Sequence, residues 1–282
     1  MKYVLKKIVT FLPNKWQIFL NFKMRVGYFP SLNNPKSFNE KIQHRKLNDN
    51  NPLFPICSDK LKVRDYVSEK IGAQYLIPLL FDGNDISIEQ LKNIEGDYVV
   101  KTTHDSGGVF VVEKSQENDF NQIKKGLDKS LQHDFGKEVS EFWYSKIQPK
   151  IIVEKMLKDK EGSVPKDYKF HVFKNNNQTR IYLQIDYDRF TTHNRSLYDE
   201  NLNLIPISWH KQNNFIELQK TKNHETMLNL VKQLAVDFNY VRVDLYNVDG
   251  QIYFGELTFA AESGFGRFSD KKFDFELGNY WG

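Results

Sequence analysis

Four polar side chains fall within a predicted β-hairpin near the carboxyl end of the chain. Arg242 and Asp244 alternate with apolar residues in one strand, and Glu256 and Thr258 lie in the next. The sequence between the strands, Asn-Val-Asp-Gly at 247–250, is typical of a hairpin turn. Carboxylates away from water need a cation or a hydrogen-bond donor. Two interpretations fit: an ion pair between Arg242 and Glu256, or a magnesium site that faces nucleotide phosphates.

The length of the hairpin loop decides which of these side chains share a face of the sheet. Side chains alternate between the faces, so a loop with an even number of residues would separate Asp244 from Glu256. A loop of about three residues, with Gly250 as a bulge, places them together, and we predict this loop. The other face is then apolar and consists of Val241, Val243, Leu245, Tyr253, Leu257 and Phe259.

A lysine on an apolar strand precedes a glycine-containing loop. Lys101 lies in Tyr-Val-Val-Lys-Thr-Thr at 98–103, and Ser106, Gly107 and Gly108 follow. Such a lysine usually extends to the surface, but glycines also let backbone amides approach phosphate oxygens beside a lysine charge. The two common phosphate-binding glycine motifs are absent from the sequence.

A second candidate segment reads Glu-Lys-Met-Leu at 154–157 and leaves a predicted strand. It fits an edge strand that ends in a charged turn. It also fits an adenine-binding edge, with backbone groups bonding the base and Met156 or Leu157 packing on its face. Arg242 fits a structural role, or stabilisation of negative charge on a transferring group.

Composition restricts the class of protein. The chain has 282 residues and a net charge of +4, with basic and acidic residues interspersed, which disfavours a nucleic-acid binder and suits an anionic substrate. Cys57 is the only cysteine, so an internal disulfide and a multi-thiolate metal site are excluded, as befits a reducing cytosol. No apolar stretch is long enough to span a membrane. Basic and apolar residues at 1–30 predict either a helix packed on the protein or an interfacial helix on the inner membrane leaflet.

Hydrophobic periodicity predicts an α+β fold with antiparallel sheets. Helices are expected at 37–45, 60–71, 118–131 and 226–238, with Ser58 or Asp59 capping the second and Gly72 ending it. Strands are expected at 98–103 and 109–112, at 151–154, and as an antiparallel pair at 168–173 and 180–186. Residues 188–203 are expected to form a mobile loop.

These motifs, taken in order, resemble the ATP-grasp superfamily, and more narrowly the TupA-like ATP-grasp family of polysaccharide gene clusters. The resemblance covers roughly Ser37 to Gly278. It is carried by the runs Ser-Asp-Lys at 58–60, Val-Val-Lys at 99–101, Val-Glu-Lys-Met-Leu at 153–157 and Gly-Glu-Leu-Thr at 255–258. The narrower family is indicated by Phe-Asn-Glu-Lys-Ile at 38–42, Asp-Tyr-Lys-Phe at 167–170 and Arg-Val-Asp-Leu-Tyr at 242–246.

The resemblance implies an ATP-grasp fold with the nucleotide between two α+β subdomains. It divides the chain into a helical basic segment (1–36), an α/β part (37–97), a small subdomain with the glycine loop and adenine edge (98–157), and a large subdomain with the metal hairpin (158–282). It also implies roles for individual residues. The residues expected to contact the phosphates and form the loop over them are Lys60, Lys101, Ser106, Gly107 and Gly108. Those expected at adenine and ribose are Glu154, Met156, Leu157 and Asp167. Magnesium is expected to be bound by Asp244, Glu256 and Thr258, and anionic groups by Arg242 and Lys169. Thr258 stands where the superfamily often has asparagine, which implies a weaker metal position.

The resemblance further implies the chemistry: a carboxylate and ATP form an acyl phosphate, an amine displaces phosphate, and ADP is released. The expected partners are ATP, magnesium, an amino acid and a uronic acid of a surface glycan, of the capsule, O-antigen or teichuronic type. The expected location is the cytoplasm, with peripheral contact to the membrane through 1–30. Alternatives are a glycosyltransferase, a label that some members carry, a sugar kinase on the same scaffold, and a non-catalytic nucleotide-binding protein.

Overall fold

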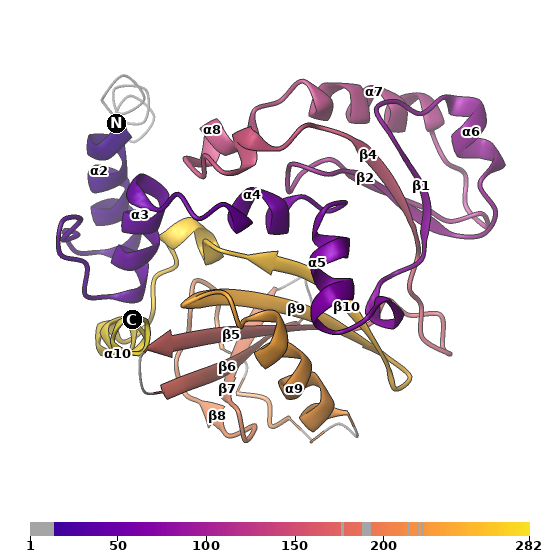
Figure 1. The fold of residues 1–282 in the computed structure, drawn as a ribbon. Coiled ribbons are helices and arrows are strands. Elements are labelled where there is room, and N and C mark those ends of the chain that lie inside the picture. The colour runs from indigo at the N-terminus through magenta and orange to yellow at the C-terminus, as the bar shows by residue number, and fades with distance from the viewer. Residues whose placement is uncertain (1–13, 176–177, 188–192, 214, 219, 221–222) are drawn as a thin grey trace. The chain divides into compact units, whose positions relative to one another are not determined.

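The computed structural model describes residues 14–282, apart from 176–177, 188–192, 214, 219 and 221–222 (Figure 1). The chain forms two compact units, each built from separate stretches of sequence. The first unit contains 1–49, 167–243 and 258–282, and the second contains 50–166 and 244–257. Residues 1–13 of the predicted basic segment lie outside the described residues. No helix among the described residues is long and apolar enough to cross a membrane.

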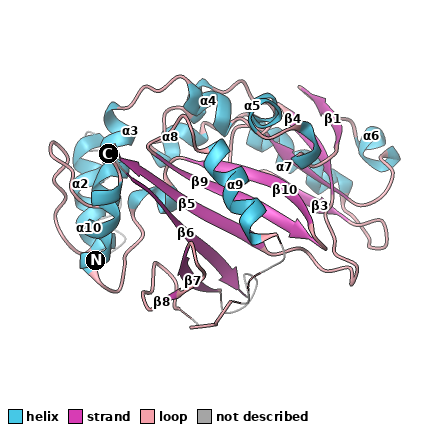
Figure 2. Ribbon diagram, turned by 60° about the horizontal axis from the view of Figure 1, so that its bottom comes forward, coloured by secondary structure: helices cyan, strands magenta, loops and turns pink. Residues whose placement is uncertain are grey.

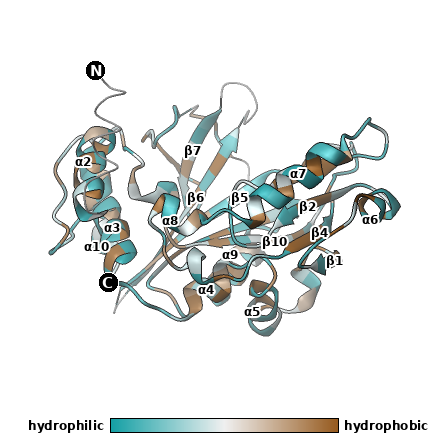
Figure 3. Cartoon of the chain, turned by 90° about the horizontal axis from the view of Figure 1, so that it is seen from above, coloured by the Kyte–Doolittle hydropathy of each residue, from teal (hydrophilic) through white to brown (hydrophobic). Residues whose placement is uncertain are grey.

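The second unit is built on a four-stranded antiparallel sheet with the order β1-β4-β2-β3. Its strands are β1 (Leu79–Gly83), β2 (Tyr98–Thr102), β3 (Val109–Val112) and β4 (Ile151–Lys155). Its α-helices are α4 (Leu53–Ser58), α5 (Val63–Lys70), α6 (Ile88–Asn93), α7 (Phe120–Leu131) and α8 (Phe135–Val139). Two short 3-10 helices, η1 (Ala73–Tyr75) and η2 (Tyr144–Lys146), complete this unit. Helix α7 has an apolar and a polar side (Figure 3). Its Ile123 and Leu127 join Tyr98, Val100 and Val153 in one buried core. One face of the sheet is therefore covered, and alternation leaves the other face for different residues.

The first unit contains α2 (Asn14–Val26), α3 (Phe38–Asn48), β5 (Asp167–Asn175), β6 (Gln178–Tyr187), β7 (Asn194–Asp199), β8 (Leu204–Ile205), α9 (His224–Leu234), η3 (Ala261–Gly264) and α10 (Lys271–Tyr280). Strands β9 (Tyr240–Val248) and β10 (Gln251–Thr258) complete a sheet with the order β10-β9-β5-β6-β7-β8. Helix α9 packs against β5 (Figure 2). Helix α3 begins with a capping box, in which Ser37 accepts from the Glu40 amide and the Glu40 carboxylate accepts from the Ser37 amide.

Several predicted elements are confirmed. The pair 98–103 and 109–112 forms the antiparallel hairpin β2–β3, and 168–173 pairs with 180–186 within β5 and β6. The helix predicted at 60–71 is wrong at its start, because Asp59 accepts hydrogen bonds from the amides of Leu61 and Lys62 and makes a turn there. Helix α5 begins at Val63, so Lys60 lies in the turn between α4 and α5.

The mobile loop predicted at 188–203 is also wrong in its middle part. Residues 194–199 form strand β7, which pairs with β6 from Tyr182 to Tyr187. The polar residues that suggested a loop lie in a strand that hydrogen-bonds to both of its neighbours, β6 and β8. Arg195 and Ser196 are buried in that strand, with polar partners. Residues 188–192 lie outside the described residues.

The predicted three-residue hairpin loop is wrong as well. Strands β9 and β10 flank a two-residue turn, Asp249-Gly250, in which both residues have positive φ, 51° and 97°. This is the backbone of the twisted hairpin turn that Asp-Gly favours. Burial along β10 nevertheless changes parity: Ile252 and Phe254 are buried, and then Leu257. Such a change of parity between Phe254 and Leu257 is typical of a β-bulge.

Candidate functional site

The face of the four-stranded sheet opposite the α7 core carries the first group of candidate residues, and it is exposed at its β3 end. Val99 lies opposite Val111 and Lys101 opposite Val109 across the β2–β3 hairpin, and Val99 lies opposite Glu154 on β4. Paired residues share a face, so these five side chains lie together. Val109 and Val111 are 44% and 50% exposed. An open apolar surface beside a lysine and a carboxylate is therefore available for a flat ligand with a charged end.

Lys101 is held by an ion pair on this face. Its Nζ lies 2.6 Å from Glu154 Oε2, and both side chains are largely buried. The other oxygen of Glu154, Oε1, accepts from Arg64 Nη1 at 3.0 Å. Arg64 lies on α5, and sequence analysis did not select it. Its position is set by tertiary packing, since it lies far from Glu154 in the chain.

Lys60 lies against the glycine loop. Its amide donates to Thr103 O at 3.1 Å, and its ammonium donates to the carbonyl of Asp105. Burial and the nearby charge of Lys101 lower the pKa of Lys60 to about 8, and the charges of Asp105, Glu256 and Asp59 oppose that shift. The structure thus brings both predicted phosphate lysines into one neighbourhood. Two like charges there favour an anionic ligand.

Asp105 organises the predicted phosphate loop. Its carboxylate accepts from Thr102 Oγ1 at 2.6 Å, from Ser130 Oγ, and from the Gly108 amide at about 3.2 Å. Burial works against its ionisation, but these hydrogen bonds and the charge of Lys60 lower the pKa of Asp105. A Cβ at Gly108 would lie 2.4 Å from Ser130 Oγ. Gly108 is therefore required for packing, whereas Ser106 and Gly107 are the exposed tip of the loop.

Some backbone groups of the predicted adenine edge already form hydrogen bonds within the second unit. The Lys155 amide donates to Pro78 O and the Met156 amide to Asp97 O, each at 3.0 Å. Since the Met156 N–H is engaged in this way, a base would have to be met by other backbone groups of Met156 and Leu157. Both side chains are half-buried.

The hairpin carboxylates differ in exposure. Asp244 is 2% exposed, whereas Glu256 is exposed and close enough to Lys60 to affect its pKa. A Cβ at Gly255 would lie 3.0 Å from Asp244 O, so the two strands approach closely there. Thr258 ends β10 and is half-buried. Among the described residues, no group of three or more histidine, cysteine or acidic side chains gathers to hold a metal. The two carboxylates Asp244 and Glu256, both in the second unit, are of the chemical type that fits magnesium, which takes hard oxygen ligands and keeps waters or phosphates.

The other predicted residues lie in the first unit. Asp167 and Lys169 form an ion pair of 2.5 Å at the start of β5. Arg242 is half-buried on β9. Burial, and then the charge of Arg242, hold the pKa of His171 well below its usual range, so Arg242 lies near β5 and His171 is neutral.

A buried charge network in the same unit was missed. Arg195 Nε donates to Asp186 Oδ1 at 2.6 Å, and its Nη1 donates to Glu262 Oε1 at 2.7 Å. Burial opposes ionisation of Glu262, but the charges of Arg195, His210 and Arg242 lower its pKa. Glu262 and Ser263 both have positive φ, 51° and 52°, a strained pair that persists only when its surroundings hold it. Gln43 does so, donating to the carbonyls of Ser263 and Gly264 at 2.9 Å. No local motif marks this network.

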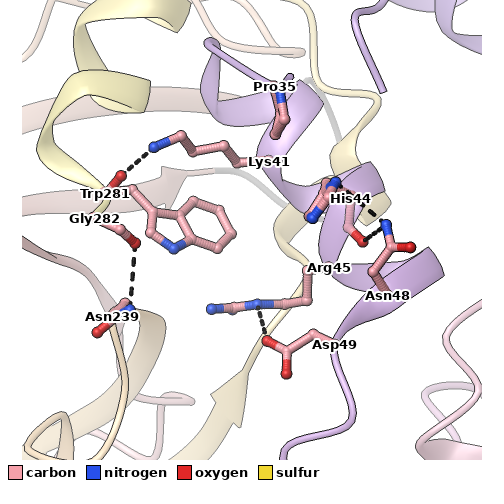
Figure 4. A pocket seen from close by; sticks show the side chains of 9 residues that line it. All are labelled: Pro35, Lys41, His44, Arg45, Asn48, Asp49, Asn239, Trp281 and Gly282. Atoms are coloured by element: carbon pink, nitrogen blue, oxygen red, sulfur yellow. Dashed lines mark hydrogen bonds and ion pairs between the residues drawn. The ribbon is translucent and has the colours of Figure 1, made fainter. Parts of the chain in front are cut away.

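A pocket of about 440 Å³ in the first unit contains none of the predicted site residues (Figure 4). Its two cations bind the protein itself. Lys41 donates to the carbonyl of Trp281, and Arg45 donates to the carbonyls of Tyr240 and Phe259 at 2.9 and 3.0 Å. The Arg45 guanidinium also lies 4.3 Å from the Trp281 ring centroid. These contacts attach α3 to the last residues of the chain, which is a structural role.

The chain was compared with known proteins. No curated protein matches the chain. Among solved structures, D-alanine-D-alanine ligase from Helicobacter pylori is 15% identical with a TM-score of 0.47, and the match covers 80% of this chain and 58% of that one. Phosphoribosylglycinamide synthetase from Anaerococcus prevotii is 14% identical with a TM-score of 0.39, covering 78% and 48%. The chain thus spans less than two thirds of either structure. The sequence profile of the TupA-like ATP-grasp family matches residues 40–281. The chain therefore belongs to the TupA-like ATP-grasp family, and the predicted α+β fold class is confirmed.

Proposed function

We propose that this protein is an ATP- and magnesium-dependent ligase that joins a carboxylate to an amine and releases ADP. The proposal rests on one observation above all: two lysines, a carboxylate and an open apolar strand surface lie together in the second unit of an ATP-grasp chain. Adenine would pack on the surface formed by Val99, Val109 and Val111. Lys60 and Lys101 would then meet the phosphates, with the exposed loop residues Ser106 and Gly107 beside them.

Magnesium would be held by Asp244 and Glu256, with Thr258 as a weaker third group. When bound, the ion would neutralise phosphate charge and polarise the transferred phosphoryl group. The remaining chemistry belongs to the chain. Arg242 would stabilise negative charge on the reacting carboxylate and on the tetrahedral intermediate, and Lys169 would bind an anionic part of the substrate. Asp167, paired with Lys169, would lie at the ribose.

The reaction balances in two steps. A carboxylate oxygen of the substrate attacks the γ-phosphorus, and the bond to the β-phosphate oxygen breaks to release ADP. The amine nitrogen then attacks the acyl carbon, the bond to phosphate breaks, and the amine loses a proton. We propose that the carboxylate is a uronic acid of a surface polysaccharide precursor and that the amine belongs to an amino acid, because members of the family are linked to polysaccharide gene clusters.

Titration calorimetry with magnesium ATP, magnesium GTP and a panel of nucleotide sugars tests the nucleotide assignment. Selective binding of magnesium ATP, with a Kd on the order of micromolar, is expected. Binding of a nucleotide sugar in preference to ATP would contradict the proposal and favour a glycosyltransferase. Tight ATP binding with a stable phosphorylated sugar as product would favour a sugar kinase.

ATP affinity should fall as the pH rises through the pKa of Lys60. Because that pKa is lowered to about 8, Lys60 carries its charge below pH 8 and loses it above. A phosphate stabilises the charged form, so the Kd for magnesium ATP should rise by at most about tenfold per pH unit in the alkaline range. Binding measured between about pH 7 and about pH 9.5 should show this rise, whereas Lys60→Arg, which stays charged, should flatten it. The same slope in Lys60→Arg would exclude Lys60 as its cause.

We further propose that the protein acts in the cytoplasm at the membrane surface and contacts anionic lipid through residues 1–30, of which the structure describes α2 and the segment after it. Trp16 and Phe29 are each 58% exposed, and Met24 is 56% exposed. Phe19 stacks on Phe29 at 5.2 Å, and the ammonium of Lys23 lies 4.9 Å from the Phe29 ring. Exposed aromatic rings beside lysines are typical of an interfacial helix.

Replacing Trp16 and Phe29 together by serine should weaken binding to phosphatidylglycerol vesicles by about tenfold or more, because two rings no longer enter the interface. Sedimentation with vesicles at low and high salt measures this. Val236→Ser is the matched control, since Val236 is 51% exposed on another part of the same unit. Equal binding by the double variant and the control would contradict the lipid contact.

A further inference from the structure

Arg64 links the helix that follows Lys60 to the carboxylate that holds Lys101. It lies in the first turn of α5, which starts three residues after Lys60. Its Nη1 donates to Glu154 Oε1 at 3.0 Å, and its Nη2 donates to Ile77 O at 2.9 Å. A planar guanidinium held at both nitrogens has a fixed orientation. Arg64 therefore fixes Glu154 with respect to the backbone that leads into β1.

Glu154 in turn determines where the Lys101 ammonium lies. It stands opposite Val99 on the neighbouring strand, so Lys101 is its diagonal neighbour on the same sheet face. Arg64 occupies one carboxylate oxygen, and Lys101 meets the other at 2.6 Å. An ammonium has three donors, so one can remain on Glu154 while the other two point elsewhere. Without Arg64, both oxygens of a largely buried carboxylate would compete for Lys101, its remaining cation.

We infer that Arg64 is a positioning residue of the phosphate site: it divides the oxygens of Glu154 so that Lys101 can present its free donors to a nucleotide phosphate. This inference deepens the proposed function and rests on it. Because Arg64 also ties α5 to the sheet, it keeps the turn that carries Lys60 in register with the strand that carries Lys101. Arg64 itself touches neither the nucleotide nor the reacting atoms.

The test is a double-mutant cycle on the Kd for magnesium ATP, with Arg64→Met, Lys101→Met and the two combined. Arg64→Met alone should raise the Kd by about tenfold, whereas in the Lys101→Met background it should change the Kd by less than about twofold. Arg64→Lys, which retains a cation for Glu154, should recover part of the affinity. Lys62→Met is the matched control, because Lys62 is exposed just before α5 and its replacement also removes one positive charge. Melting temperatures of all variants report whether they fold.

Each outcome is decisive. A Kd unchanged by Arg64→Met would overturn the inference and leave the proposed function intact. A full tenfold effect that persists in the Lys101→Met background would show that Arg64 acts independently of Lys101, and would also overturn it. A loss of affinity for magnesium ATP equal to that of Lys62→Met would mean that only the removed positive charge matters, and would overturn the inference too. If the wild-type protein does not bind magnesium ATP, the proposed function fails first, and the role of Arg64 falls with it.

Discussion

Replacing Asp244 by asparagine and Glu256 by glutamine in one variant is expected to lower ATP turnover by about 100- to 1,000-fold. Both changes keep the size of the side chain and remove its charge. A neutral amide oxygen is a poorer magnesium ligand than a carboxylate, and the charge on the transferred phosphoryl group would lose its counter-ion. Asp244 is buried on β9, and Glu256 lies close enough to Lys60 for its charge to raise the pKa of that lysine.

The matched control is Asp249→Asn in the turn of the same hairpin. Asp249 accepts a hydrogen bond from the Lys160 amide at 2.8 Å and is exposed, so it reports any general effect of losing a hairpin carboxylate. ADP formation is measured over a range of magnesium concentrations. If magnesium binding is weakened, turnover by the double variant should recover partly at high magnesium. If the double variant turned over ATP as fast as Asp249→Asn, the two carboxylates would not be the magnesium ligands.

Replacing Phe38 by alanine is expected to lower the free energy of unfolding by about 3–5 kcal/mol, the usual cost of removing a large buried aromatic side chain. Phe38 is fully buried at the start of α3. Its ring lies 4.9 Å from the ring of Tyr240 and 5.4 Å from that of Phe173, with Trp209, Phe268 and Trp281 also around it. The cavity would therefore open at the point where α3, α10 and the large sheet are joined.

Urea unfolding followed by tryptophan fluorescence measures this loss, because Trp209 and Trp281 pack on the same ring. Phe142→Ala is the control, since Phe142 is 42% exposed and should cost far less. A midpoint for Phe38→Ala equal to that of the control would mean that the cluster relaxes to fill the space, and that α3 is not anchored by this ring.

The sequence carries enough local information to predict the elements that hold the candidate residues. The apolar run at 98–103 predicts strand β2. In the structure its burial alternates, with Tyr98 and Val100 in the core, which leaves Lys101 on the opposite face. The residues that signal the start of a helix were less reliable. A polar Ser-Asp pair predicts a helix cap, but Asp59 instead closes a turn that keeps Lys60 outside α5. That turn lets Lys60 lie against the glycine loop.

The residues that support the site could not be predicted, because their roles depend on distant parts of the chain. Arg64 pairs with Glu154 across a separation of 90 residues, and Arg195 pairs with Glu262 across 67. Neither pair has a local spacing that a helix or strand would impose. The prediction of the hairpin loop was wrong for a different reason. The number of loop residues and a β-bulge each decide which face of the sheet a side chain lies on, so the residue pattern alone does not separate the two.

Phosphate release from magnesium ATP, measured with and without pooled amino acids and uronic-acid glycans, tests the ligase proposal most directly. Product masses are recorded from the same reactions. ADP and phosphate that form only when both pools are present, together with an amide-linked adduct whose mass is the sum of its two parts less one water, are the expected result. ADP accompanied by a phosphorylated sugar and no amide, or sugar transfer from a nucleotide sugar without ATP, would contradict it.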